Sequence, residues 1–417
     1  VYVDLTEAVK YTVIKTRNVS GRTRRLSATG YVEWVLGDMR PKTCMHIVTE
    51  LDLNSGAIFA RNSYNLEFGN RIAYFDVNDT AKTITTDRTE FIGRNGTLKN
   101  PDAMNRSRLS GKTGAAMDPC AVIQVTFELA DGEERETVFC LGSGIDANTA
   151  SLMVRRFRGR AAAKEALGLV QKYWEKTLSV IRVESPDASL DHLTNGWLTY
   201  QTLSCRLWAR SGFYQSGGAF GFRDQLQDVL SLLHAEPNLA REQLLLCASR
   251  QFKEGDVQHW WHPPTGRGVR TRCSDDYLWL PFVTSRYVMV TGDVDVLKEQ
   301  VIFLDGRILN PGEESYYDLP IRYDHPQSLY DHCVKAIEHG LTFGEHGLPF
   351  IGSGDWNDGM DKVGIHGKGE SVWLGFFLYD VLKRFAEIAQ LHGDLDFAER
   401  CKNHEEELKE CIEDHAW

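Results

Sequence analysis

The sequence lacks several features by which whole classes of protein are recognised. No apolar run approaches the roughly 20 residues that a membrane span requires, so no membrane segment is expected in this chain. It has no Gly-x-Ser-x-Gly elbow and no phosphate-binding Gly-Lys-Ser/Thr loop, so a serine-triad hydrolase and an NTPase have no support. Lys and Arg number 47 against 58 Asp and Glu, and the net charge is -11. Because phosphate backbones demand clustered Lys and Arg, nucleic acid is not expected as a partner.

Disulfide and targeting patterns are absent as well. The nine cysteines are an odd number, and no Cys-x-x-Cys pair occurs. A chain of 417 residues needs no disulfide bonds to hold its core, so we predict reduced thiols and a cytoplasmic location. The chain starts at Val1 with no basic-then-apolar targeting pattern and ends at Trp417 within an unfinished helical pattern, so we expect a partial chain.

The first third of the chain carries strand patterns. Its clearest run, 123–129, alternates apolar and polar residues with period two, which predicts a strand. Asp131-Gly132 suits the positive φ angles of a tight turn, and 136–141 supplies a return strand, so we expect a hairpin here. Similar short runs elsewhere predict an antiparallel β-sandwich over residues 1–147.

Helical patterns dominate from residue 148 onward. Residues 148–183 are rich in Ala, Leu, Lys and Glu and predict a helical linker. Within 184–417, helices alternate with long Gly- and Pro-bearing loops, which is typical of an α/α toroid whose site is built from loops at one end. We expect helices at 188–208, 223–234, 237–252, 274–292, 327–340, 370–391 and 395–415. Asp187 and Ser274 are the expected N-caps of two of them.

The loop Gly352–Met360 is the densest functional feature. Its glycines allow backbone angles that other residues rarely adopt. Between them lie Asp355, Trp356 and Asp358. A Trp offers a flat apolar face to the C–H surface of a sugar ring, while carboxylates and amides reach the hydroxyls. We therefore predict a sugar-binding loop.

A calcium loop is the structural alternative for this segment. Asp355, Asn357 and Gly359 match part of such a loop. Its twelfth position should be a bidentate Glu, however, and it is His366 here. The sugar reading is therefore preferred.

A second glycine-rich segment, 213–228, leads into an expected helix. Arg223, Asp224 and Asp228 lie in its first turns, and Asp224 and Asp228 share a helix face. Acids at a helix start can simply complement the helix dipole. The glycine and aromatic approach favours a ligand-lined loop, whereas a dinucleotide site lacks the required preceding strand.

A third segment holds His259 and His262 around the pair Trp260-Trp261. Without a His-Glu-x-x-His helix or a third ligand at fixed spacing, we predict no metal site. Paired tryptophans suit either a sugar platform or a core corner. For Asp276, a capping role near the following helix competes with ligand binding, and Glu370 at a helix start has the same two readings.

Four ordered runs together resemble glycoside hydrolase family 94, the inverting phosphorylases of cellobiose, chitobiose and cellodextrins. These runs are Tyr214–Asp228, Ser274–Leu280, Gly352–Met360 and Gly369–Leu374. The wording of Tyr31-Val32-Glu33-Trp34 and Gln225–Asp228 is most similar to the β-1,2-glucan branch, which includes 1,2-β-oligoglucan phosphorylase and the C-terminal domain of cyclic β-1,2-glucan synthase.

The resemblance implies a multidomain β and α protein with a β-sandwich, a helical linker and an (α/α)6 barrel that is incomplete in this chain. It implies that Asp358 protonates the glycosidic oxygen while inorganic phosphate, a co-substrate, attacks the anomeric carbon from the opposite face. No other cofactor is expected. We expect burial beside Trp356 to raise the pKa of Asp358. The resemblance and the site patterns together give the candidate sugar contacts Tyr214, Arg223, Asp224, Trp356, Asp276 and Glu370.

Two departures concern phosphate. Cellobiose-type members carry an Arg six residues before the position of Asp224, and Gly218 stands there instead. Family members also supply a phosphate-binding His and Thr well beyond the general acid, where this chain ends. Arg210 and Arg272 are the candidates for binding phosphate in place of these residues. By analogy with the family, we expect a homodimer.

Three alternatives stay open. One is that the chain is the phosphorylase-like domain of a cyclic β-1,2-glucan synthase. The others are an inverting glucan hydrolase with Asp224 or Asp276 as base, and a non-catalytic glucan-binding protein.

Overall fold

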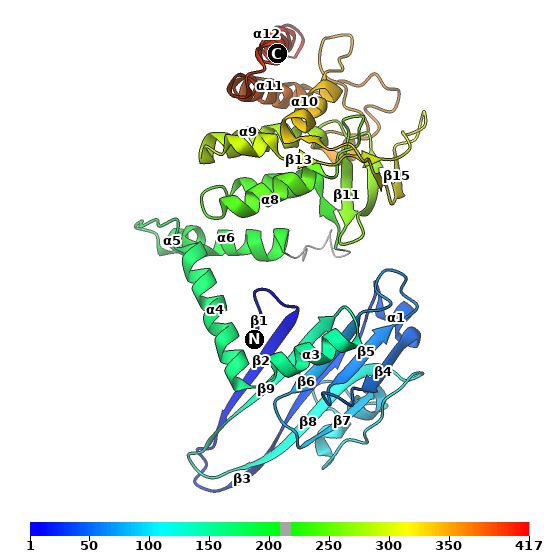
Figure 1. Cartoon of the computed structure of the whole chain (residues 1–417), viewed down its shortest axis with the longest axis vertical. Coiled ribbons are helices and arrows are strands. Elements are labelled where there is room, and N and C mark those ends of the chain that lie inside the picture. The colour runs from blue at the N-terminus through cyan, green and yellow to red at the C-terminus, as the bar shows by residue number, and fades with distance from the viewer. Residues whose placement is uncertain (209–217, 417) are drawn as a thin grey trace. The chain divides into compact units, whose positions relative to one another are not determined.

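The computed structural model describes residues 1–208 and 218–416, which form two compact units. The first unit is Val1–Glu175 and the second begins at Lys176. The helix α4 (Arg160–Leu178) runs across the division (Figure 1).

The first unit is built on two antiparallel sheets. One sheet has the strand order β1-β2-β9-β6-β5-β4 and the other the order β3-β8-β7. The strands of the larger sheet are β1 (Tyr2–Val3), β2 (Val9–Arg17), β4 (Ile47–Leu51), β5 (Ile58–Asn62), β6 (Ile72–Val77) and β9 (Glu134–Gly144). Those of the smaller sheet are β3 (Arg24–Glu33), β7 (Lys82–Asp87) and β8 (Pro119–Leu129). The predicted β-sandwich is confirmed.

The alternation of side chains along β8 and β9 builds the layers of this unit. Ile123 and Val125 of β8 pack against Phe139 of β9 in the core between the sheets. Val138 and Cys140 point to the other face of the larger sheet, where α3 (Ala147–Phe157) and the start of α4 cover them. Period two thus explains why both faces of β9 are buried.

The predicted hairpin between β8 and β9 is wrong. Gly132 does adopt a positive φ of 77° in a turn. The two strands nevertheless belong to different sheets: β8 pairs with β3 and β7, whereas β9 pairs with β2 and β6. A turn signal fixes a change of direction, but the partner of each strand is decided by which apolar face it buries.

The second unit is mainly helical. Its first helical segment contains α5 (Ala188–His192) and α6 (Leu198–Gln201). The others are α7 (Phe222–Leu230), α8 (Pro237–Ala248), α9 (Trp279–Thr291), α10 (Leu329–Gly340), α11 (Val372–His392) and α12 (Leu395–His415). Each helix lies within, or within three residues of, a range expected from the sequence. Asp187 caps α5 as predicted, since its side chain accepts a hydrogen bond from the Ser189 N–H.

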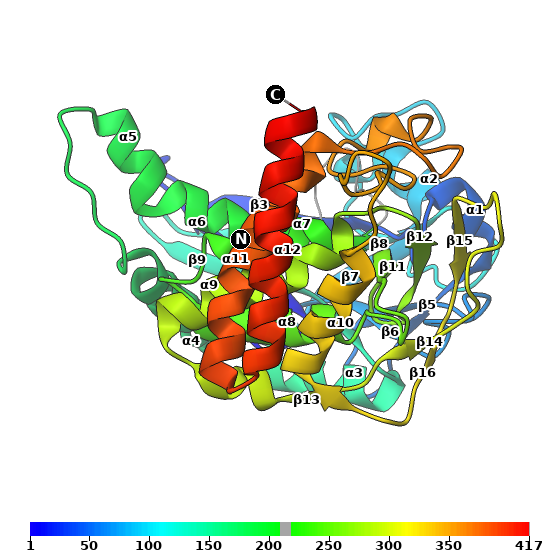
Figure 2. The same ribbon diagram turned by 90° about the horizontal axis from the view of Figure 1, so that it is seen from above.

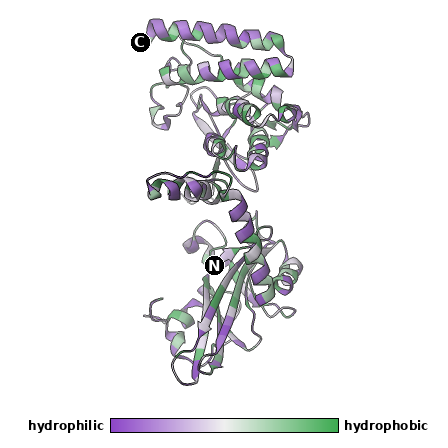
Figure 3. Ribbon diagram, turned by 90° about the vertical axis from the view of Figure 1, so that its left-hand side faces the viewer, coloured by the Kyte–Doolittle hydropathy of each residue, from purple (hydrophilic) through white to green (hydrophobic). Residues whose placement is uncertain are grey.

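The helix α9 is the centre of this unit. It packs against α7, α8, α10 and α11, and α11 packs against α12 (Figures 1 and 2). Even its Thr284 and Ser285 are buried. The outer helix α12 is amphipathic instead, with hydrophilic residues along much of its length (Figure 3), and it buries Phe397, Ala398, Cys401, Leu408 and Ile412. No described helix is long and apolar enough to cross a membrane.

A small sheet lies in loops that the sequence left unassigned. Its order is β10-β11-β12-β15, and its strands are β10 (Phe220–Gly221), β11 (Gln258–His262), β12 (Arg267–Thr271) and β15 (Ser315–Asp318). Figures 1 and 2 show β11 and β15 at one end of α8 and α9. Two further strand pairs are β13 (Gln300–Val301) with β17 (Gln327–Ser328), and β14 (Leu304–Asp305) with β16 (Ile321–Arg322).

The sandwich core makes one stability prediction. Ile123→Ala should destabilise the first unit by about 2–5 kcal/mol, because Ile123 is fully buried between the sheets and its loss leaves a cavity. Leu66→Ala, at a fully exposed Leu, should change stability by less than about 0.5 kcal/mol. Urea unfolding followed by circular dichroism compares the two; equal midpoints would contradict the assigned core.

Candidate active site

Arg223 joins the segments that carry the candidate site residues. It lies in the first turn of α7, and its side chain is 9% exposed. One guanidinium nitrogen, Nη2, donates to both carboxylate oxygens of Asp358 at 2.9 Å. The other, Nη1, donates to both oxygens of Asp275 at 3.2 Å and to the Asp355 carbonyl at 3.3 Å. A single cation therefore holds both the candidate acid and its loop.

Asp275 is the buried counter-ion of this cation. It is fully buried and also accepts a hydrogen bond from the Trp279 indole at 3.1 Å. Burial, together with the charge of Asp276, raises the pKa of Asp275 to about 7, while Arg223 opposes that rise. Burial lowers the pKa of Arg223, but the surrounding carboxylates outweigh it and raise that pKa above its ordinary value.

Asp355 supports the loop. It is 3% exposed. Its Oδ1 accepts from the backbone N–H of Asn357 at 2.8 Å and from the Asn357 side-chain amide at 3.1 Å, while Oδ2 accepts from the Ser371 hydroxyl at 2.5 Å. Both oxygens are thus committed to holding the turn, which leaves Asp358 as the carboxylate that the loop presents.

Ser274 does not cap a helix, so that prediction is wrong. The helix α9 begins later, with Leu278 as its N-cap. The Ser274 hydroxyl instead donates to the carbonyls of Ile351 and Gly354, and its backbone N–H donates to the Gly354 carbonyl. These bonds attach the segment before α9 to the loop of Asp358.

The burial expected for Asp358 is not found. Its side chain is 57% exposed, and Trp356 is 49% exposed. The loop places Asp355 inward and turns Trp356 and Asp358 outward. The Trp356 ring lies 6.5 Å from that of Trp373, which lies 5.4 Å from Phe377. The loop thus exposes a carboxyl group and a Trp ring that joins a row of aromatic side chains.

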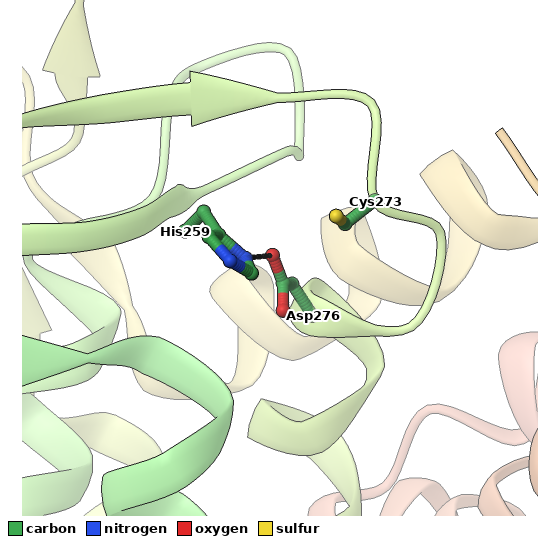
Figure 4. A group of neighbouring side chains, drawn as sticks. All are labelled: His259, Cys273 and Asp276. Atoms are coloured by element: carbon green, nitrogen blue, oxygen red, sulfur yellow. Dashed lines mark hydrogen bonds and ion pairs between the residues drawn. The ribbon is translucent and has the colours of Figure 1, made fainter. Parts of the chain in front are cut away.

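Asp276 is buried and forms a pair that sequence spacing did not reveal. It is 1% exposed, and its Oδ2 lies 2.7 Å from Nδ1 of His259 (Figure 4). The Asp276 charge, against the effect of burial, raises the pKa of His259 to about 11. The register of β11 against β12 shifts between Gln258 and Trp260, so His259 sits at a β-bulge, which re-aims a side chain.

The remaining candidates are dispersed. Glu370 is bound to His346, through the backbone N–H at 3.0 Å and through Nδ1 at 2.9 Å. Arg272 donates to the backbone carbonyls of Leu309, Asn310 and Glu313, so it holds a neighbouring loop. Asp224 is partly exposed on α7 beside Arg223. Tyr214 and Arg210 lie outside the described residues.

Comparison with protein families shows which family this chain belongs to. The glycosyl hydrolase 94 superfamily catalytic domain matches residues 173–417, more than half of the chain, and the glycosyl hydrolase 94 supersandwich domain matches residues 1–160. The chain belongs to this family. The catalytic-domain match includes Arg223, Asp275 and Asp358, and family 94 includes glycoside phosphorylases.

Curated family 94 relatives extend along nearly all of this chain. It is 39% identical over 96% of its length to the cyclic beta-(1,2)-glucan synthase NdvB of Rhizobium meliloti, of which it spans 14%. It is 24% identical over 97% of its length to the N,N'-diacetylchitobiose phosphorylase of Vibrio furnissii, and spans 52% of that protein. With the solabiose phosphorylase of Paenibacillus borealis it shares 28% identity, over 80% of this chain and 40% of the relative.

Solved structures agree on the fold. A bacterial glucoamylase in complex with acarbose aligns over 97% of this chain and 55% of its own, with a TM-score of 0.54 at 10% identity. A protein described as a kojibiose phosphorylase from the human microbiome aligns over 98% of this chain and 52% of its own, with a TM-score of 0.52 at 8% identity. These neighbours are (α/α)6-barrel enzymes, and this chain has an antiparallel β-sandwich followed by a helical domain, so the predicted architecture is confirmed.

The bridging role of Arg223 can be tested by stability. At pH 8, Arg223→Met should destabilise the protein by about 1–3 kcal/mol, because the buried Asp275 carboxyl must take up a proton once its cation is gone and the hydrogen bond to the Asp355 carbonyl is lost. The loss should shrink below pH 7, since the pKa of Asp275 is about 7 and the neutral carboxyl needs no cation.

Arg241 supplies the matched control. It pairs with Asp293 and Glu299, and all three side chains are 30–44% exposed, so Arg241→Met should cost only about 1 kcal/mol. Chemical unfolding over a pH series measures both variants. A similar loss in the two, or a loss at Arg223 that is independent of pH, contradicts the assigned role.

Proposed function

We propose that this chain supplies the general acid and part of the donor-sugar site of an inverting glycoside phosphorylase that acts on β-1,2-linked glucooligosaccharides. The observation that carries the proposal is the exposed Asp358 carboxylate, held at both oxygens by Arg223, on a loop that also exposes Trp356. Family 94 membership and the similarity to phosphorylases support it.

In the proposed reaction, Asp358 donates its proton to the glycosidic oxygen. The bond between that oxygen and the anomeric carbon breaks, and its electron pair stays on the departing sugar. Inorganic phosphate forms the new bond from the opposite face, so the anomeric configuration inverts. The products are a sugar 1-phosphate and a shortened oligosaccharide. Phosphate is already an anionic nucleophile, so no second carboxylate is needed to activate it.

Arg223 fits the ionised state of the acid. A single guanidinium nitrogen, Nη2, lies 2.9 Å from both oxygens of Asp358, and charge-assisted contacts of this kind are strongest with an ionised carboxylate. A protonated carboxyl carries no charge and is a weaker acceptor. We infer that the proton-bearing Asp358 turns towards the glycosidic oxygen and that Arg223 receives the carboxylate after transfer.

The carboxylates near Asp358 favour phosphorolysis over hydrolysis. An inverting hydrolase needs a base about 6.5–9.5 Å from the acid to activate water. Asp276 is buried and paired with His259, and Asp275 is buried and paired with Arg223. Neither can present an open carboxylate to water. Asp224, which is partly exposed, is the remaining base candidate of the hydrolase alternative.

The choice of β-1,2-glucan as substrate depends on similarity to the synthase of Rhizobium meliloti, at 39% identity along nearly the whole chain. The same similarity favours a second candidate function, in which the chain is the phosphorylase-like domain of a cyclic β-1,2-glucan synthase. Phosphate binding is assigned to no described residue, because the guanidinium of Arg272 is engaged with backbone carbonyls. Homodimer formation and a cytoplasmic location stay predictions.

Phosphate dependence tests the reaction class. The protein, expressed with its natural full-length sequence, is incubated with β-1,2-glucooligosaccharides with and without inorganic phosphate. We expect α-glucose 1-phosphate only when phosphate is present, detected by phosphorus NMR. Free glucose at equal rates in both conditions would indicate the hydrolase, and binding without any product would indicate the non-catalytic alternative.

The role of Asp358 can be separated from sugar binding. Asp358→Asn should slow phosphorolysis of an oligosaccharide by about 10²–10⁴-fold, because the amide cannot protonate the leaving oxygen. A β-glucoside with a dinitrophenyl leaving group needs no protonation, so the variant should lose much less activity on it. Initial rates with both substrates measure the difference.

Asp361→Asn, three residues further along the same loop, is the matched control and should keep near-normal rates on both substrates. If Asp358→Asn slows the two substrates equally, or if the control loses as much activity, Asp358 is not the proton donor.

A further inference from the structure

A group of three potential metal ligands lies next to the loop of Asp358. It consists of His259 on β11, Cys273 just after β12 and Asp276 before α9. One ligand atom of each residue lies within 4.8 Å of the other two. Figure 4 shows the Cys273 side chain pointing toward the His259 ring and the Asp276 carboxylate. Among the described residues, no other His, Cys, Asp and Glu side chains form such a group.

We propose that His259, Cys273 and Asp276 form a binding site for a thiophilic divalent cation of the zinc class. Thiolate, imidazole and carboxylate are the donors that zinc uses in proteins. Three protein ligands leave one position of a tetrahedron open for water or another ligand. This site is additional to the sugar and phosphate chemistry, and it does not depend on the proposed function.

The distances allow such coordination after a small rearrangement. Zinc bonds of about 2.0–2.3 Å place neighbouring donor atoms roughly 3.3–3.8 Å apart. The present spread of up to 4.8 Å thus requires a contraction on the order of 1 Å. His259 and Cys273 are only partly buried, and rotation of the Cys273 side chain can supply much of this movement.

The charge of Asp276 gives a second, independent reason for a cation here. Its carboxylate is 1% exposed, and Oδ1 has no hydrogen-bond partner among the described residues. Leaving a buried charged oxygen unsatisfied costs free energy. A divalent cation can take the place of the His259 proton between the two side chains and would also supply a partner for Oδ1, which the contact with His259 leaves unsatisfied.

Occupancy would also reinforce the loop of Asp358. Cys273 forms a β-bridge with Gly352, and the adjacent Ser274 donates to the Gly354 carbonyl. Asp276 follows Asp275, the buried partner of Arg223. A bound cation would cross-link β11 to this segment, so we expect it to raise the melting temperature of the protein.

Cobalt(II) serves as a spectroscopic probe for the site. The chain is purified, freed of metal with a chelator and titrated with Co²⁺. We expect one equivalent to produce a sulfur-to-cobalt charge-transfer band and the visible bands of a tetrahedral site, both removed by Zn²⁺. Cys273→Ser should abolish the charge-transfer band, and His259→Gln should weaken binding more than about tenfold.

Two variants outside the group are the controls. Cys44→Ser alters another partly exposed cysteine, and His262→Gln alters a histidine on the same strand. Both should keep the wild-type bands and affinity. Circular dichroism and the metal-free melting temperature check that each variant is folded. The absence of a charge-transfer band in the wild type, or its persistence in Cys273→Ser, overturns the proposal.

Discussion

The contact of Arg223 with Asp275 on one side and Asp358 on the other is the interaction on which the site depends. It brings together three segments that are far apart in sequence, at a position where a cation is almost fully removed from water. Burying such a charge is costly unless anions and oriented carbonyls surround it. The Asp275 carboxylate and the Asp355 carbonyl satisfy this need, so the position of the exposed Asp358 follows from buried electrostatics.

Local patterns predicted much of the fold, because helix periodicity and strand alternation depend on residues that are close together in the sequence. The cap at Asp187 was foreseen because it depends on a contact only two residues away. The hairpin after β8 and the cap at Ser274 failed for the opposite reason. In each case a partner distant in sequence, another sheet or the carbonyls of the 351–354 loop, outcompeted the nearby one.

The same limit explains the site residues that the sequence did not connect. In the sequence, His259 and His262 stand close together without a third metal ligand at a fixed spacing, so no metal site was predicted. The bulge in β11 turns His259 towards Asp276, and β12 carries the chain back to Cys273. No short motif encodes that meeting. The exposure of Asp358 was also unpredictable. Asp355 points inward because it binds Ser371, whereas Asp358 stays exposed while it binds Arg223, and both partners are distant in sequence.

The register of β2 against β9 has a consequence for synthesis of the protein. Val9 pairs with Gly142 and Arg17 with Glu134, so the partner of β2 lies more than a hundred residues later in the sequence. On the ribosome, β2 is made early and its edge stays unpaired until β9 emerges. Unpaired strand edges invite association with other chains. The nascent sandwich thus passes through a period in which that edge is open to pairing with another chain.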